Sequence, residues 1–168
     1  MVSTIHSVAK IHRIAYISPS NTSTDTPPDV TEALIQVLNT LSATFSAFVF
    51  DFTPLTYPPA STSQLENYDA IWCTTPYARS SIPQHPPCFS PSNAATASPN
   101  FFDALCSAAD MLRHLSERDA ADALTVAVKK VGLASPRSGD LGAENRGEDV
   151  PGAAGAVCAE IEEAIRHT

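Results

Sequence analysis

The chain has 168 residues with a formal net charge of -8, and 43% of its residues are hydrophobic. This length fits one domain, and the apolar content suffices for a buried core. The acidic balance argues against a nucleic-acid-binding surface, which needs clustered Lys and Arg. No apolar run is long enough to span a bilayer, and residues 1–10 lack the apolar segment of a signal peptide. We therefore expect a cytoplasmic protein that binds neither nucleic acid nor membrane.

The head of the chain, residues 1–73, predicts alternating strands and helices. Residues 11–18 contain a continuous apolar run, which is typical of a strand covered on both faces. Thr26 and the two prolines after it mark a helix start. The core-facing positions of this helix are Val30, Leu34, Val37, Leu38 and Leu41. Residues 45–52 and 70–73 predict two more strands, separated by a short helix or turn, so we expect a parallel sheet of order 2-1-3 with right-handed crossovers.

A connector of different composition, residues 74–99, follows the third predicted strand. It contains six prolines and many Ser and Thr residues. Prolines at this spacing exclude a regular helix or a central strand. A connector of this length inside a compact domain is either functional or disordered.

The tail, residues 100–168, predicts three helices. The first begins after Asn100, the second opens at a capping box over residues 116–119 and stops at Gly132, and the third begins at residues 149–151. The expected core positions are Phe101, Leu105, Ala108, Ala109, Leu112, Ala120, Ala123, Leu124, Ala127, Val128, Val131, Val157, Ile161 and Ile165. The expected fold class is α/β, a small three-layer domain with a mainly parallel sheet flanked by helices, and residues 1–168 form one domain.

Four cysteines are spread widely along the chain, at Cys73, Cys88, Cys106 and Cys158. They form no CxxC or His/Cys pattern of a metal site. We expect reduced thiols that are mostly buried.

Two blocks of short motifs carry a family resemblance. In the first block, residues 12–17 read His-Arg-Ile-Ala-Tyr-Ile, residues 65–71 read Leu-Glu-Asn-Tyr-Asp-Ala-Ile, and residues 82–85 read Ile-Pro-Gln-His. In the second block, residues 105–112 read Leu-Cys-Ser-Ala-Ala-Asp-Met-Leu, and residues 139–142 read Gly-Asp-Leu-Gly. In order and spacing, these blocks resemble the opening and the end of the β-decarboxylating dehydrogenases, the family of isopropylmalate, isocitrate and tartrate dehydrogenases. Shorter matches to the same family lie at residues 27–30, 98–99 and 148–150.

The resemblance implies the first domain of the isopropylmalate dehydrogenase fold without its inserted central domain. The family oxidises a 2-hydroxy acid with a nicotinamide and a divalent metal, and most residues for that chemistry belong to the missing middle. In the segment that resembles the cofactor loop, His85 is followed by Pro86 and Pro87, which have no N–H to donate. Ser90 stands where the family has an Asp for the ribose. We therefore expect no cofactor and no metal, and residual NAD-dependent dehydrogenation is the least favoured function.

The candidate site is the cleft at the carboxyl ends of the predicted strands, where open α/β sheets bind ligands. The segments that follow the three strands are expected to converge there. A histidine near a tyrosine can perform general acid–base catalysis, and an arginine can bind a carboxylate or stabilise an enolate. The catalytic candidates are His85, Tyr77 and Arg79. The substrate-binding candidates are Asn21, Asp25, Phe52, Tyr57 and Trp72.

Each candidate also has a purely structural interpretation. His85 fits an ordinary loop histidine, because nothing in the sequence identifies its partner. Tyr57 and Tyr77 fit side chains that cover the sheet edge. Trp72, between two apolar residues, fits the core, and Asp25 fits a helix cap.

Two functions from different classes remain at this point. The first is a repurposed, cofactor-independent cyclase or isomerase on a degraded dehydrogenase domain. The Ser/Thr/Pro/Ala-rich sequence suggests a source in fungal secondary metabolism. The second is a non-catalytic binding or regulatory subunit, with a homodimer formed through the surface that the missing domain would have covered.

Overall fold

Within the described residues, four parallel strands form the sheet, and its order confirms the predicted arrangement. The strands are β1 (Lys10–Ile17), β2 (Phe48–Pro54), β3 (Ala70–Cys73) and β4 (Cys88–Phe89). They are ordered β2-β1-β3-β4, so the expected order 2-1-3 is extended by one edge strand. The computed structural model describes residues 9–17, 29–55, 62–74, 86–91, 101–134 and 150–166. β1 is central because it pairs with β2 over most of its length and with β3 at its carboxyl end.

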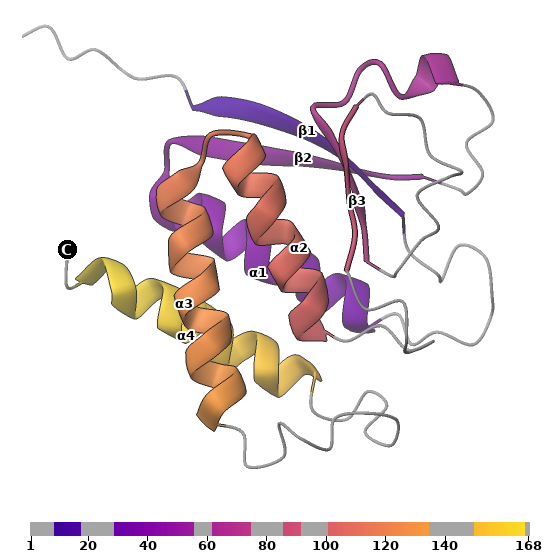
Figure 1. The fold of residues 1–168 in the computed structure, drawn as a ribbon. Coiled ribbons are helices and arrows are strands. Elements are labelled where there is room, and N and C mark those ends of the chain that lie inside the picture. Colours follow the sequence, from indigo (N-terminus) through magenta and orange to yellow (C-terminus); the bar gives the residue numbers. More distant parts are fainter. Residues whose placement is uncertain are drawn as a thin grey trace, which may run out of the picture.

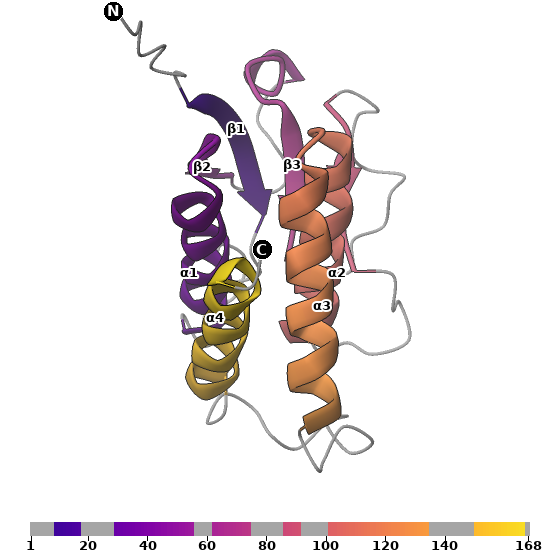
Figure 2. The ribbon, with the colours of Figure 1, turned by 90° about the vertical axis from the view of Figure 1, so that its left-hand side faces the viewer.

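Four helices lie on one face of this sheet (Figure 1). They are α1 (Asp29–Phe45), α2 (Phe101–His114), α3 (Arg118–Ala134) and α4 (Val150–Arg166). α1 lies beside α4 and α2 lies beside α3, which gives two helix pairs (Figure 2). α1 and α2 contact the strands, whereas α3 and α4 pack mainly on the other helices. α1 from the head and α2 from the tail thus cover a sheet whose first three strands come from the head.

Side chains that alternate along β1 separate two apolar clusters, since successive residues of a strand face opposite sides. On the helix side, Ile14 packs with Trp72 of β3 and with side chains of all four helices. On the other side, Ala15 and Ile17 pack with Ile71 and with residues from the segment that carries the short 3-10 helix η2 (Thr62–Gln64). The expected α/β fold class is confirmed. The layers are the helices, the sheet and this shorter covering segment.

The periodic positions predicted for the helices are largely confirmed. In α1, Leu34, Val37, Leu38 and Leu41 are fully buried, and Val30 packs partly against the same core. The expected core positions of α2 are all buried, and those of α3 and α4 are buried or partly buried, apart from Ile165, whose side chain lies outside the described residues. The spacing of apolar residues in the sequence identified the buried face of each helix. It could do so because a helix in a protein is stabilised mainly by the packing of its apolar face.

The boundaries of two elements differ from prediction. The second strand was expected over residues 45–52, but α1 continues through Phe45, whose ring packs against the core. Ser46, in the left-handed backbone region with φ 50°, then ends the helix. The prediction that Gly132 stops a helix is also wrong, since α3 continues to Ala134.

The predicted capping box at residues 116–119 is replaced by a different junction. Ser116 has a φ of 70°, and its amide donates to the Arg113 carbonyl at 3.2 Å. The amide of Glu117 donates to the Leu112 carbonyl at 2.9 Å. This pair of bonds is a Schellman motif that ends α2. The backbone carbonyl of Glu117 accepts a hydrogen bond from the Ala121 amide at 3.0 Å. Glu117 is therefore the residue that caps the start of α3, one residue later than expected.

β4 lies inside the proline-rich connector and was not predicted. Its two residues pair with β3 at Ile71 and Trp72. Pro86, Pro87 and Pro91 surround it. The strand lies at the sheet edge, where neighbouring prolines are tolerated, so the exclusion of a central strand holds.

Replacing Leu38 with Ala is expected to lower the free energy of unfolding by about 2–5 kcal/mol, because a fully buried leucine would leave a cavity. Urea denaturation followed by circular dichroism measures this change. Gln36→Ala, on the exposed side of α1, is the matched control and should change stability by less than about 0.5 kcal/mol. Equal effects of both variants would contradict the assigned core face.

Candidate functional site at the carboxyl edge of the sheet

The strand order places a topological switch point between β1 and β3. From β1 the chain connects to β2 on one side, and from β2 it crosses to β3 on the other side. In open α/β sheets, ligands bind outside the strand ends at such a point. β1 and β3 stay hydrogen-bonded to each other up to their carboxyl ends, since the Thr74 amide donates to the Ile17 carbonyl at 3.1 Å. The buried Thr74 hydroxyl donates to the same oxygen at 3.3 Å, so the described sheet is closed by hydrogen bonds up to these residues.

Aromatic side chains line the helix side of this sheet edge. Tyr16 and Phe52 are both half-buried, and their rings meet edge to face with centroids 6.4 Å apart. Tyr16 also lies beside Trp72 in the register of β1 and β3. Half-buried aromatic rings offer an apolar surface to a ligand, and a tyrosine adds one polar hydroxyl. Tyr16 was interpreted from the sequence only as a strand residue. Its position beside a strand end is the signal that could have identified it.

Trp72 belongs to the core. Its side chain is fully buried, and its Nε1 donates to Ser107 Oγ of α2 at 3.0 Å. Ser107 Oγ in turn donates to the Ala104 carbonyl at 2.8 Å. The core interpretation of Trp72 is therefore confirmed, and a role as substrate platform would require the indole to be uncovered.

Most of the predicted site residues lie outside the described part of the chain. These are His85, Tyr77, Arg79, Asn21, Asp25 and Tyr57. Of the predicted site residues, the structure thus describes only Phe52 and Trp72, which lie at the carboxyl ends of β2 and β3.

A pair formed by a buried histidine and a partly exposed carboxylate lies toward the opposite end of β1. His12 is 1% exposed, and its Nε2 lies 2.8 Å from Oε1 of Glu117. A carboxylate only accepts hydrogen bonds, so this nitrogen carries the proton. The rings of Phe48 and Phe50 pack beside the imidazole, with centroids 5.8 and 6.3 Å away. Sequence reasoning missed this pair because its members are far apart in the chain. It links β1 to the start of α3.

Two cysteines meet on the other face of the sheet. Cys73 Sγ of β3 and Cys88 Sγ of β4 are 3.4 Å apart. The hydrogen bond with Cys88, together with burial, raises the pKa of the Cys73 thiol. All four cysteines were expected to be mostly buried, but only Cys73 is buried. Cys88 and Cys158 are half-buried, and Cys106 is exposed on α2. The contact between the Cys73 and Cys88 thiols lies at the carboxyl end of β3, one residue before Thr74.

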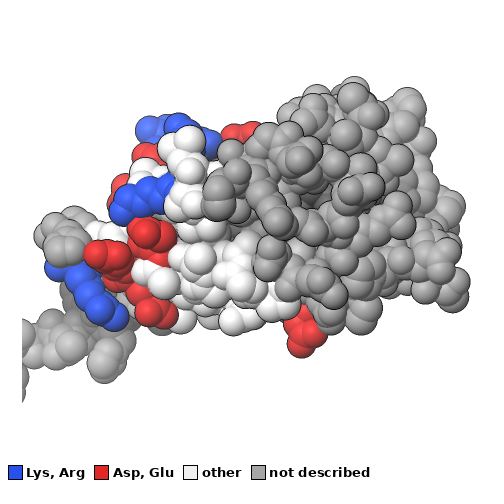
Figure 3. All heavy atoms as spheres, turned by 90° about the horizontal axis from the view of Figure 1, so that it is seen from below, with Lys and Arg blue, Asp and Glu red and all other residues white. Residues whose placement is uncertain are grey.

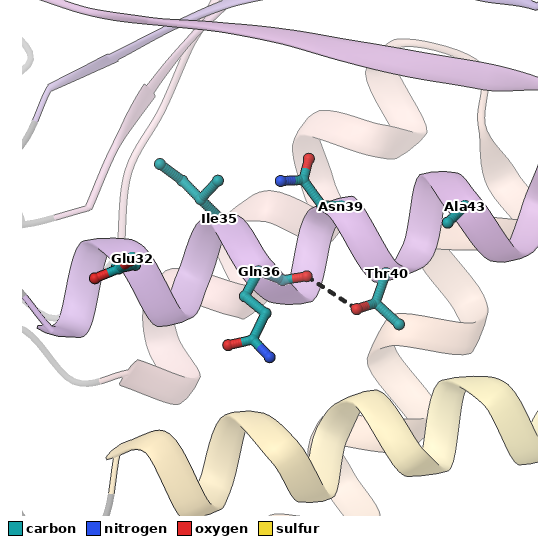
Figure 4. Close-up of a pocket in the computed structure, with 6 residues that line it drawn as sticks. All are labelled: Glu32, Ile35, Gln36, Asn39, Thr40 and Ala43. Carbon is teal, nitrogen blue, oxygen red and sulfur yellow. Dashed lines mark hydrogen bonds between the residues drawn. The ribbon is translucent and has the colours of Figure 1, made fainter.

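Other surfaces of the described residues offer less chemistry. A hollow of about 600 Å³ is lined by residues of α1 alone, with Glu32 and Asn39 among them, and shows no convergent charged groups (Figure 4). Basic and acidic side chains of the described residues are interspersed on the face seen in Figure 3. Within the described ranges, no group of three or more His, Cys, Asp or Glu side chains could hold a metal, and no helix is long and apolar enough to cross a membrane.

Comparison with protein-family models, curated proteins and solved structures gives no match to this chain. The resemblance to the β-decarboxylating dehydrogenases therefore stays a prediction from the motifs.

The hydrogen bond between Trp72 and Ser107 is expected to couple the sheet to α2. Ser107→Ala should cost about 1–3 kcal/mol of unfolding free energy, because it leaves a buried indole N–H without a partner. In a double-mutant cycle with Trp72→Phe, the coupling energy should be about 1 kcal/mol. Chemical denaturation followed by circular dichroism measures all four proteins. Fully additive effects would show that the bond contributes nothing.

Glu117→Ala is expected to lower the unfolding free energy by about 1–3 kcal/mol, since the buried His12 loses its acceptor. Glu117→Gln retains a carbonyl oxygen in the same place and should cost less. Glu162→Ala, an exposed acid of α4, is the control for loss of one negative charge. If the stabilities of Glu117→Ala and Glu162→Ala match in thermal melts, the pair has no structural role.

Proposed function

We propose that this chain is a cofactor-independent enzyme of the cyclase or isomerase type, acting on a small organic molecule at the carboxyl edge of its sheet. The observation that carries the proposal is the switch point between β1 and β3, which has half-buried aromatic side chains beside it. An apolar wall with few polar groups suits a reaction in which the protein shapes a substrate and moves a proton. Such a reaction needs neither a nicotinamide nor a metal.

The proposed catalytic groups come from the segment after β3. His85 and Tyr77 would exchange a proton with the substrate, and Arg79 would stabilise an enolate or a carboxylate. All three lie between β3 and β4 in the sequence, which supports the proposal that they lie near the end of β3. Phe52 and Tyr16 would contribute the apolar wall, with Asn21, Asp25 and Tyr57 as polar contacts. The proposed origin is a β-decarboxylating dehydrogenase domain of fungal secondary metabolism that has lost its redox chemistry.

To test this proposal, extracts of the source organism are incubated with and without the purified protein. Untargeted mass spectrometry then compares the metabolites in the two samples. Wild-type protein should deplete a metabolite and produce an isomer of the same mass. His85→Ala should slow this conversion by at least about 100-fold, the usual contribution of a general acid or base. Leu133→Ser, an exposed position near the end of α3, is the control and should retain full activity. No conversion by the wild-type protein in any extract would contradict the proposal.

A titration with NAD, followed by thermal shift, separates this proposal from residual dehydrogenase activity. A ligand at a hundred times its dissociation constant stabilises a protein by about 2.7 kcal/mol. We expect no shift of the melting temperature, because Pro86 and Pro87 stand where the resembled loop would donate amides. A saturable shift would favour the dehydrogenase.

The second candidate is a binding or regulatory subunit, and one observation favours it. Ile11 and Val49 are neighbours in the register of β1 and β2, and both are exposed, by 62% and 45%. The next pair on this face is Arg13 and Asp51, both exposed. A second copy, related by a two-fold axis, would cover the apolar pair and match each Arg13 with an Asp51. Sedimentation that shows a monomer at high concentration would count against this homodimer.

A further inference from the structure

The contact between the Cys73 and Cys88 thiols has no part in the proposed catalysis. The two residues lie on adjacent strands, and their sulfur atoms are 3.4 Å apart. Cys88 pairs in register with Ile71, so Cys73 lies two positions further along β3, and both thiols share one face of the sheet. Widely spaced cysteines gave no sequence signal for such a contact.

We propose that Cys73 and Cys88 form a reversible disulfide by exchange with a low-molecular-weight disulfide, and that this bond ties β4 to β3. β4 is held in the sheet by only two register pairs, at Ile71 and Trp72. A covalent bond would therefore hold it far more firmly than these pairs do. The proposal concerns the thiols alone and goes beyond the proposed enzyme activity, so either can fail without the other.

Unequal burial of the two thiols sets the order of the exchange. Cys88 is half-buried, whereas Cys73 is fully buried. The small disulfide therefore meets Cys88 first. Hydrogen bonding to Cys88, together with burial, raises the pKa of the Cys73 thiol and makes it the weaker initial nucleophile.

The exchange proceeds in two balanced steps. The Cys88 thiolate attacks one sulfur of the small disulfide, which forms a mixed disulfide and releases one small thiolate. Cys73 then loses its proton, and its sulfur attacks Cys88 Sγ and releases the second small thiolate. The protons of the two cysteines end on the two small thiols, and the protein loses two electrons that the small disulfide gains. Cys73 is well placed for the second step because its sulfur already contacts Cys88.

The ring closed by this bond contains residues 73–88, which include the proposed catalytic segment. Closing a loop of this size restricts the unfolded chain and stabilises the folded protein. Oxidation is therefore expected to raise the melting temperature, by up to about 10 °C. Reduction with an excess of small thiol should reverse the shift.

The other two cysteines provide internal controls. Cys106 is exposed on α2, and Cys158 lies on α4 and is half-buried. Partial desolvation by the neighbouring helix residues, together with the charges of Asp103 and Asp110, raises the pKa of the Cys106 thiol, so it should form a mixed disulfide only slowly. Cys106→Ser is the working background because Cys88 and Cys106 share one tryptic peptide, residues 80–113.

The experiment incubates the Cys106→Ser protein with oxidised glutathione, followed by a tryptic digest without reductant. Cleavage after Arg79 separates the two cysteines, so the proposed bond joins peptide 14–79 to peptide 80–113. We expect this linked pair, a protein mass reduced by the two lost hydrogen atoms, and a higher melting temperature. Cys158→Ser in the same background should behave identically, and Cys88→Ser should lose both the link and the temperature shift.

Two results would overturn the proposal. The first is a folded protein in which the 14–79 and 80–113 peptides stay unlinked at every ratio of oxidised to reduced glutathione. The second is a link that forms only when the protein is unfolded, which circular dichroism of the oxidised sample would reveal. Either result would assign the contact to ordinary packing of two small buried side chains.

Discussion

Burial of the carboxyl half of β1, residues 14–17, on both faces is the constraint on which the rest of the structure depends. Ile14 on one side and Ala15 and Ile17 on the other are excluded from solvent. A strand of this kind must be paired on both edges and covered on both faces, because its backbone groups and side chains have no access to water. β2 and β3 supply the edges, the helices supply one cover, and the segment with η2 supplies the other.

Two polar contacts, one buried and one partly buried, fix how the tail sits on the sheet. Trp72 binds Ser107 of α2, and His12 binds Glu117 at the start of α3. Apolar packing alone tolerates small shifts of one layer over another, whereas a buried donor left without an acceptor costs free energy. No buried side-chain nitrogen or oxygen among the described residues lacks a partner. These two bonds therefore give the packing of helices on strands a definite register.

The candidate site follows from the same arrangement. Parallel strands end at one edge, and the crossing of the chain from β2 to β3 makes the ends of β1 and β3 a switch point. Tyr16 and Phe52 lie there because their side chains share the helix face of the sheet. The thiols of Cys73 and Cys88 lie near the same strand ends on the opposite face. The proposed binding edge and the proposed disulfide thus lie near the same strand ends but on opposite faces of the sheet.

Local features of the sequence determined the type and the buried face of the main elements. Helical spacing identified Leu34 and Leu38 as core residues, and the apolar run at residues 14–17 identified a strand covered on both faces. These features are readable because periodicity depends on the element itself. The first and last residues of the helices and strands were predicted less accurately. Phe45 and Ser116 fit either of two neighbouring elements by propensity, and packing of the core and backbone bonding decided between them.

The sequence by itself determined the class of fold and the order of the first three strands. Only the tertiary structure decided the edge strand β4, the burial of Trp72 against Ser107 and the two long-range contacts, His12 with Glu117 and Cys73 with Cys88. The reason is physical. Periodicity and capping act over a few residues, whereas these contacts join side chains that become neighbours only after the sheet and the helices have packed together.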